Sequence, residues 1–192
     1  MPFSNNWFER DAQAKFEKYL SDLNVDSYLE VGVCEGRSFL WVYENLRPSF
    51  MCGIDHWKAR RRTDQEAFDI YRKNFESNTE VIRQDSDCEL VILHTDSVKG
   101  LAHLVLGDAG EDHSFDLIYC DGTHFGLPTL IDMCMAYSLL NVGGMLVVDD
   151  LNRWFGREPQ TRIAVHAFEQ VSHTRMERSW LDGRQCGFVK KK

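Results

Sequence analysis

The sequence lacks any apolar run that approaches the roughly 20 residues needed to span a bilayer. Its six cysteines include no C-x-x-C pair, and no group of histidines and cysteines has the spacing of a zinc site. The first residues, M-P-F-S-N-N-W-F-E-R, show no basic start followed by an apolar core, so no signal peptide is expected. These absences predict a cytoplasmic protein with reduced thiols and no membrane partner.

Positive charge is also scarce. The chain has 22 Lys and Arg against 30 Asp and Glu, a formal net charge of -8. A general nucleic-acid binder needs a basic surface for the phosphates, so that class is excluded. Two short basic runs, residues 58–62 and 190–192, are the exceptions. Both are interpreted as solvated surface, and the alternative for the first is a clamp for an anionic substrate.

Apolar runs of strand length alternate with segments of helical periodicity. The expected strands are residues 28–32, 50–55, 89–94, 115–121 and 144–149. The expected helices are residues 11–23, 38–45, 63–75, 97–106, 127–140 and 160–171. This alternation predicts an α/β fold with a parallel sheet covered on both faces. Residues 174–181 and 185–190, around Asp182 and Gly183, predict an antiparallel hairpin at the end.

The length of 192 residues, without a linker or an internal repeat, fits a single domain over residues 1–192. Its parts would be an N-terminal helix within residues 1–25, a cofactor-binding core over 26–151, and a C-terminal helix with the hairpin over 152–192.

Acidic residues stand where the expected strands end. Asp55, Asp121 and Asp149 end the second, fourth and fifth strands; Asp150 follows, and Asp96 lies two residues beyond the third. The carboxyl ends of parallel strands form the ligand crevice of such sheets. Any one of these acids could merely cap a helix, which is the commoner use of Asp. Because all of them open onto one edge, we expect them to face a ligand or a metal.

Residues 30–38, E-V-G-V-C-E-G-R-S, form a glycine-containing turn after the first strand. The turn lacks the middle glycine of the dinucleotide fingerprint G-x-G-x-x-G, and no Lys follows Gly36 as a phosphate-binding P-loop requires. Glu30 and Glu35 would place negative charge near a pyrophosphate, which is unfavourable. Gly32 and Gly36 would let the backbone approach a ligand closely. The ligand is therefore expected to be neutral or cationic at this point.

These residues resemble class I S-adenosylmethionine-dependent methyltransferases, whose first motif is commonly E/D-x-G-x-x-x-G. C-G-I-D at residues 52–55 is similar to the family's second motif. L-H-T-D-S at 93–97, F-D-L-I-Y-C-D-G-T-H at 115–124 and L-L-N-V-G-G-M-L-V-V-D-D at 139–150 follow in the family's order. The resemblance covers about residues 28–150 and implies a Rossmann-like three-layer sandwich. Its mostly parallel seven-stranded sheet would end in an antiparallel hairpin.

The resemblance implies S-adenosylmethionine as the cofactor and methyl donor. Asp55 would take both ribose hydroxyls, and Asp96 or Ser97 would face the adenine amine. His56 could stack on the adenine or contact the substrate, although an ordinary role in the loop is as compatible with the sequence. The implied cofactor-binding residues are Glu30, Gly32, Gly36, Ser38, Asp55, His56, Asp96, Ser97 and Asp121.

D-G-x-H followed by G-G-x-x-x-x-D-D resembles a small-molecule O-methyltransferase branch that includes macrocin- and cephalosporin-type enzymes and, more distantly, catechol O-methyltransferase. Several of these hold a divalent metal, so the resemblance implies magnesium ligands at Asp121, Asp149 and Asp150, with Asn152 as a further candidate. The alternative is that Asp149 and Asp150 cap the next segment. Asp121 would then meet the sulfonium or the substrate through water.

Methyl transfer to a hydroxyl requires in-line alignment and removal of the acceptor's proton. A metal could lower the pKa of the hydroxyl, and without one Asp121 or His124 could act as the base. The expected partner is a small-molecule substrate, and a sugar-like metabolite is the first candidate. A homo-oligomer is also compatible with the sequence. Trp154 and Phe155 lie in W-F-G-R-E-P, a candidate mobile lid.

Two other functions stay open at this point. A nicotinamide-dependent oxidoreductase could use a similar sheet, although the missing glycine and the acids of the turn count against it. A catalytically inactive module that only binds the cofactor would show the same pocket motifs.

Overall fold

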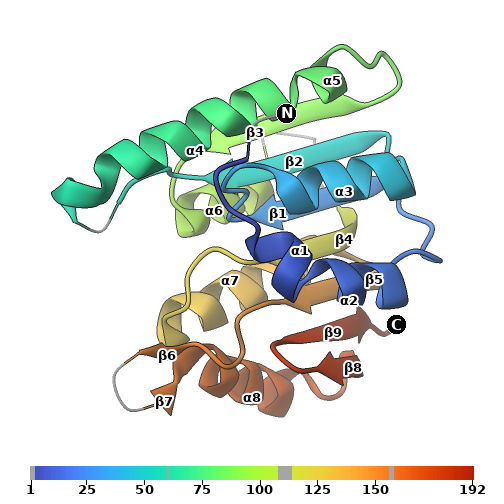
Figure 1. Ribbon diagram of the computed structural model, residues 1–192. Helices are drawn as coiled ribbons and strands as arrows, with labels where there is room; N and C mark the ends of the chain where they lie inside the picture. Colours follow the sequence, from blue (N-terminus) through green and yellow to red (C-terminus); the bar gives the residue numbers. More distant parts are fainter. Residues whose placement is uncertain (1–2, 60, 108–113, 156–157) are drawn as a thin grey trace.

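A seven-stranded sheet forms the centre of the protein in a computed structural model that describes residues 3–59, 61–107, 114–155 and 158–192. The strand order is β3-β2-β1-β4-β5-β9-β8 (Figure 1). β1 to β5 pair in parallel, whereas β9 is antiparallel to both β5 and β8. The strands are Ser27–Val31 (β1), Phe50–Asp55 (β2), Glu89–His94 (β3), Phe115–Cys120 (β4), Leu140–Val148 (β5), Met176–Asp182 (β8) and Gln185–Lys190 (β9). The predicted α/β fold, with its mostly parallel sheet and closing hairpin, is confirmed.

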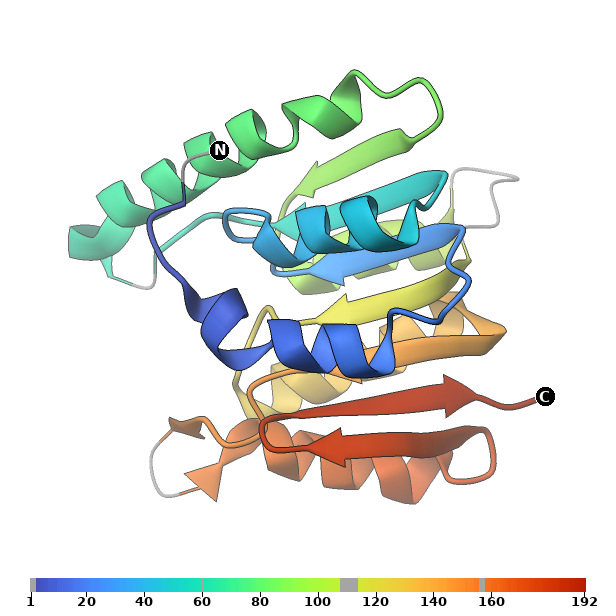
Figure 2. The ribbon, with the colours of Figure 1, turned by 45° about the vertical axis from the view of Figure 1, so that its right-hand side comes forward.

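Helices cover both faces of the sheet, which gives the expected three layers (Figure 2). Phe16, Phe39 and Phe75 belong to one apolar cluster, and Leu101 and Phe168 belong to the other. The first face carries Trp7–Asp11 (α1), Gln13–Tyr19 (α2), Arg37–Leu46 (α3), Gln65–Asn78 (α4) and Glu80–Arg83 (α5), with a short 3-10 turn at Arg62–Asp64 before α4. The second carries Ser97–Leu106 (α6), Gly126–Leu139 (α7) and Gln160–Ser172 (α8). Among the helices described, none has the length and apolar character to cross a bilayer.

Local sequence explains the bounds of two helices that matter for the site. α3 starts after Gly36 and ends before Pro48, which cannot continue a helix. α6 begins after Asp96, whose side chain accepts a hydrogen bond from the backbone N–H of Lys99 at 3.1 Å. This is an ordinary N-cap, so the capping role considered for Asp96 is present in the structure.

The N-terminal helix expected over residues 11–23 differs from the structure. Two short helices, α1 and α2, meet at Ala12, and α2 ends at Tyr19. The apolar spacing that predicted one helix is used differently, because Phe8 and Phe16 pack edge to face across the break at 5.1 Å. Asp22 and Asn24 favour turns over helix interiors, which agrees with the early end of α2.

The segment after β5 also differs from the expected loop. Trp154–Phe155 (β6) pairs antiparallel with Glu158–Pro159 (β7), so the candidate lid contains a small two-stranded ladder. Gly156 lies outside the described residues. In the terminal hairpin, Asp182 pairs with Gln185, so the two-residue loop is Gly183 and Arg184 rather than Asp182 and Gly183.

Candidate functional site

Strand register brings the ends of the central strands together at one edge of the sheet. Val31 of β1 pairs with Ile54 of β2 and Cys120 of β4, and Cys120 pairs with Val148 of β5. The backbone ladder continues one residue further, since Asp121 donates its N–H to the Val31 carbonyl at 2.9 Å. In Figure 2 the arrowheads of the parallel strands all point to this side, which we call the carboxyl edge. Gly32, Asp55, Asp121 and Asp149 all lie there.

The backbone conformation and the packing of the turn require glycine at residues 32 and 36. Gly32 has φ +93°, and a Cβ on it would lie 2.5 Å from the carbonyl oxygen of Asp121. Gly36, at φ +83°, is the N-cap of α3, and a Cβ on it would lie 3.0 Å from the Phe75 ring. The backbone after β4 and a core ring occupy the space that a side chain would need, so both positions require glycine, and their contact with a ligand stays a prediction.

Glu30 is a fully buried carboxyl group at the end of β1. It accepts hydrogen bonds from the hydroxyl groups of Ser38, at 2.5 Å, and Tyr28, at 2.6 Å. Burial raises the pKa of Glu30 to about 7, although both hydrogen bonds oppose that shift. Glu30 and Ser38 are thereby brought together, and they tie the end of β1 to the first turn of α3.

Glu35 directs its side chain to the N-terminal segment and to α4. Its carboxylate is only 2% exposed and accepts hydrogen bonds from Ser4, Asn5 and Asn74. The N-terminal segment and α4 thus neutralise the polarity of this group. Ser38 and Tyr28 engage Glu30 in the same way, so repulsion between these acids and a pyrophosphate stays a prediction. The turn still lacks the middle glycine of the dinucleotide fingerprint.

Asp55 joins the loops that follow β1 and β2. Its carboxylate accepts the backbone N–H of Cys34 at 3.0 Å and that of Trp57 at 2.8 Å. The indole N–H of Trp57 returns to the Cys34 carbonyl at 2.9 Å, so three hydrogen bonds close a ring. Burial raises the pKa of Asp55, with the two backbone N–H groups opposing it. The side chain is held in one orientation and keeps lone pairs for a ligand.

The other residues predicted for the adenine side surround this ring at the surface. His56 is exposed, and its Nδ1 accepts the backbone N–H of Lys58 at 2.7 Å, which is an ordinary loop role. Asp96 forms an ion pair with Lys99 at 3.1 Å in addition to its cap. Burial raises the pKa of Asp132, a buried side chain of α7, to about 6, and the neighbouring Ser97 opposes that shift. Sequence reasoning missed Asp132, which looked like any polar residue of an apolar helix.

A buried network holds Asp149. Its carboxylate accepts the Tyr119 hydroxyl at 2.5 Å and the Gln185 amide at 2.7 Å. Burial raises its pKa against these two hydrogen bonds. Asp121 lies beside it, with an oxygen 3.5 Å from the Tyr119 hydroxyl. Burial, followed by repulsion from Asp149 and Asp150, raises the pKa of Asp121 well above its usual range.

Asp150 is held by arginines on two sides. Arg153 donates to its carboxylate at 2.9 Å, and Arg184 of the β8–β9 turn makes a second ion pair. Burial disfavours the charge, but Arg184 and Arg153 outweigh it and hold the pKa of Asp150 below its usual value. His124 Nε2 lies 3.5 Å from Asp150 and 3.1 Å from an Arg153 nitrogen. Burial lowers the pKa of His124 to about 4, so its ring is neutral near pH 7.

Asp121, His124 and Asp150 offer ligand atoms that all lie within 4.8 Å of one another, which fits a divalent cation. This set differs from the predicted one, Asp121, Asp149 and Asp150, because His124 joins it. Asp149 is engaged by Tyr119 and Gln185, and its role as a ligand stays a prediction. A cation at this place would compete with Arg153 for Asp150. The Asn152 side chain instead bonds to the Gly183 carbonyl and to Arg162.

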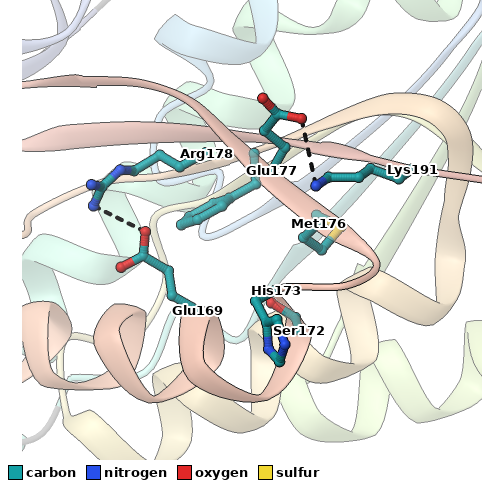
Figure 3. A pocket seen from close by; sticks show the side chains of 8 residues that line it. Glu169, Ser172, His173, Met176, Glu177, Arg178 and Lys191 are labelled. Atoms are coloured by element: carbon teal, nitrogen blue, oxygen red, sulfur yellow. Dashed lines mark ion pairs between the residues drawn. The ribbon is translucent and has the colours of Figure 1, made fainter.

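A separate hollow of about 350 Å³ lies near the end of α8 (Figure 3). Lys191 is one of the residues that line the hollow. It follows Val189, which pairs with Met145, and β9 runs antiparallel to β5, so Lys191 lies at the opposite edge of the sheet from the acids. Two ion pairs join its charged residues, Arg178 with Glu169 at 2.9 Å and Lys191 with Glu177 at 3.5 Å. Among the described residues, none of those that line this hollow belongs to the predicted site.

Sequence reasoning missed several residues that complete the edge. They are Tyr119, Arg153, Arg184, Gln185 and the polar residues of the N-terminal segment. Tyr119 stands two residues before Asp121 on the same side of a strand, a spacing that could have indicated the contact. Arg184 lies in the hairpin turn and Gln185 follows it, and no local signal links them to β5.

Comparison with known proteins gives one family match. A family model described as a methyltransferase domain matches residues 29–151. A curated relative, the uncharacterized protein R132 of Acanthamoeba polyphaga mimivirus, is 25% identical over 143 residues. The match covers 73% of this chain and 58% of R132, so the chain spans less than two thirds of that relative.

Solved structures share the fold at low sequence identity. The O-methyltransferase from Bacillus cereus, in complex with SAH, has a TM-score of 0.63 and 16% identity, over 87% of this chain and 75% of that one. The N-methyltransferase NodS from Bradyrhizobium japonicum, in complex with S-adenosylhomocysteine, has a TM-score of 0.61 and 16% identity, over 98% and 90%. With the family model matching residues 29–151 of 192 and this strand order, the protein belongs to the class I S-adenosylmethionine-dependent methyltransferase family.

Proposed function

We propose that this chain binds S-adenosylmethionine along the glycine turn and methylates a hydroxyl group of a small molecule, with a sugar-like metabolite as the first candidate. The observation that carries the proposal is the fixed carboxylate of Asp55, which two backbone N–H groups orient at the carboxyl edge. A carboxylate in that position can accept hydrogen bonds from both hydroxyls of a ribose. When bound, the donor supplies a methyl group on a positively charged sulfur, and the acids of this edge suit that charge.

Without a metal, Asp121 is the residue best suited to remove the acceptor's proton. A general base works best when its pKa approaches the working pH, and the pKa of Asp121 is raised in that direction. His124 is neutral and could also accept a proton, but its Nε2 lies within 3.1 Å of Arg153. The guanidinium would first have to move away. The arrangement therefore favours Asp121 as the base and His124 as a residue that contacts the acceptor.

A divalent metal is the finer part of the proposal. Asp121, His124 and Asp150 would hold it, and it would supply a Lewis acid that lowers the pKa of a bound hydroxyl. The neighbouring side chains fix the acids of the site. Tyr119 and Gln185 hold Asp149, while Arg153 and Arg184 balance the charge of Asp150.

The test compares ligands on the same protein. Isothermal titration calorimetry with S-adenosylhomocysteine should give a dissociation constant on the order of micromolar, and NAD should give no binding. The reverse pattern would replace the methyltransferase with a nicotinamide enzyme. Single-turnover transfer of a labelled methyl group to a panel of hydroxyl-bearing metabolites then separates an active enzyme from a module that only binds the cofactor.

A further inference from the structure

The N-terminal segment, residues 3–11, lies on the same side of the molecule as the carboxyl edge. Figure 2 shows it running from beside α4 down to α1, on the side to which the parallel strands point. The segment carries many exposed side chains, and it is attached to the rest of the chain through polar contacts and through the packing of Phe3 and Phe8 on the core. We call it the clasp.

One end of the clasp is fixed to the glycine turn through Glu35. Ser4 donates both its backbone N–H, at 3.0 Å, and its hydroxyl, at 2.6 Å, and Asn5 donates its amide at 2.8 Å. Asn74 of α4 completes the set at 2.7 Å. A buried carboxylate is costly unless donors surround it, and most of the donors here come from the clasp. The conformation of the turn and the position of the clasp therefore depend on each other.

Arg37, the first residue of α3, holds the same end of the clasp. It donates to the Asn5 carbonyl at 2.9 Å, pairs with Glu9, and lies over the Phe3 ring at 3.9 Å. Its contacts go to the clasp, so both charged residues that flank Gly36 bind this segment.

The other end of the clasp reaches the group formed by Asp121, Asp149 and Asp150, which we call the acid cluster. Asp11 forms an ion pair with Arg184 at 3.3 Å, and Arg184 also pairs with Asp150. The Arg184 guanidinium thus bridges an acid of the clasp and an acid of the acceptor side. Removing Asp11 would leave Arg184 with one fewer anchor next to Asp150.

We propose that the clasp is part of the functional site: it positions the donor turn through Glu35 and Arg37 and positions Asp150 through Arg184. The link to methyl transfer rests on the proposed function, whereas the positioning itself does not. Since one segment is attached to both places, a ligand that orders the turn also orders the acid cluster, and the coupling is reciprocal. Glu35, Arg37 and Arg184 are positioning residues in this account.

Hydrogen–deuterium exchange on the ligand-free protein tests the positioning directly. Ser4→Ala with Asn5→Ala removes two side-chain donors to Glu35 without touching the turn itself. The amides of Cys34 and Gly36, which bond to Asp55 and Val33, should then exchange several-fold faster. Asn6→Ala is the matched control, because the Asn6 side chain makes no cap hydrogen bond in the same segment. Unchanged exchange of the turn in the double variant, with the fold intact, overturns the proposal.

Asp11→Ala tests the other end in the same experiment. The amides of Asp150 and Arg153, which bond to Asp149 and to the Asp150 carbonyl, should exchange faster than in the Asn6→Ala control. If they do not, the link from the clasp to the acids is wrong. Ser4→Thr retains the hydroxyl donor, so the turn should exchange as slowly as in the unaltered protein. A difference between Ser4→Thr and the double variant would show that the lost donors, and not a general loss of stability, cause the faster exchange. If the double variant unfolds, single Ser4→Ala takes its place.

Calorimetry with S-adenosylhomocysteine adds the functional readout. The Ser4→Ala, Asn5→Ala variant should bind about fivefold or more weakly than the Asn6→Ala control, the low end of typical coupling between sites. Equal affinity would overturn the coupling to the donor. Failure of the unaltered protein to bind would overturn the proposed function instead, and the exchange results would still decide whether the clasp positions the turn.

Discussion

The carboxylate of Asp55 accepts the backbone N–H of Cys34 across 3.0 Å, which joins the loop after β2 to the turn after β1. Trp57 closes the same ring through its own backbone N–H and its indole. The contact fixes a group predicted to bind a sugar before any ligand arrives. Preorganisation of this kind reduces the cost of ordering the site on binding.

Asp55→Asn should therefore weaken the binding of S-adenosylhomocysteine by about tenfold or more, equivalent to about 1.4 kcal/mol. Asparagine keeps the shape, but it loses the negative charge and one acceptor oxygen. Calorimetry measures the change, and Asp22→Asn, in the exposed turn after α2, is the control for loss of one carboxylate. Equal affinities for both variants would remove Asp55 from the donor site.

Gly32→Ala should destabilise the protein far more than Gly143→Ala. Both glycines have positive φ, +93° and +86°, so the backbone strain is comparable. A Cβ on Gly32 meets the Asp121 carbonyl at 2.5 Å, whereas at Gly143 nothing lies within 4 Å. Overpacking costs typically 1–3 kcal/mol, and about 1 kcal/mol shifts the melting temperature of a chain of this size by roughly 2–4 °C.

Thermal unfolding of the two variants side by side measures the difference. Gly32→Ala should melt roughly 5 °C or more below Gly143→Ala. Equal melting temperatures would show that the edge of β1 can move away from β4, which the close backbone approach does not permit.

Glu30 predicts a pH dependence of stability. Its pKa is about 7 in the folded protein against 4.5 for an ordinary glutamate, so the folded state holds the proton more tightly than the unfolded state. The contribution of Glu30 to stability should therefore fall as the pH rises from about 5 to about 8, by about 3 kcal/mol at most.

Urea unfolding of the Glu30→Gln variant across this range isolates that contribution. The variant should lose less stability than the unaltered protein as the pH rises, because glutamine does not titrate. Glu44→Gln, on the exposed side of α3, should retain the original pH dependence. A Glu30→Gln profile parallel to that of the unaltered protein would contradict the raised pKa.

The ion pair between Arg153 and Asp150 should affect the affinity of the site for a metal. If Asp121, His124 and Asp150 bind a divalent cation, Arg153→Ala should tighten that binding, because it frees an oxygen of Asp150. The Arg153 side chain is about half exposed, and such ion pairs contribute up to about 1 kcal/mol, so the gain is on the order of fivefold.

Titration of the protein with Mn²⁺, followed by the relaxation of water protons, measures the affinity. Asp121→Asn should lose the site, and Arg72→Ala, which removes an exposed arginine from its ion pair with Glu76 on α4, should leave it unchanged. Identical affinity in all variants would place any bound manganese elsewhere.

The parts of the fold that follow from local periodicity were predictable. The helix expected over residues 97–106 is α6 with the same bounds, and the one expected over 160–171 differs from α8 by one residue. Both have an apolar face that packs on the sheet and clear signals at their ends. The order of the acids along the chain likewise predicted that Asp55, Asp121 and Asp149 share one edge.

Contacts between distant segments were not predictable in the same way. Glu35 reads as a charge on the turn, and only the folded chain brings Ser4 to it from 31 residues away. Arg184 meets Asp150 across 34 residues through the hairpin. Such pairs leave no periodic pattern, because each depends on where the chain returns to the same edge.

A crystal structure of the complex with S-adenosylhomocysteine tests the central claim most directly. The account predicts the ribose hydroxyls within hydrogen-bonding distance of the Asp55 carboxylate, with the sulfur beside the glycine turn and towards Asp121. A complex that holds the compound at another place, or that leaves Asp55 without a contact to it, would contradict the account.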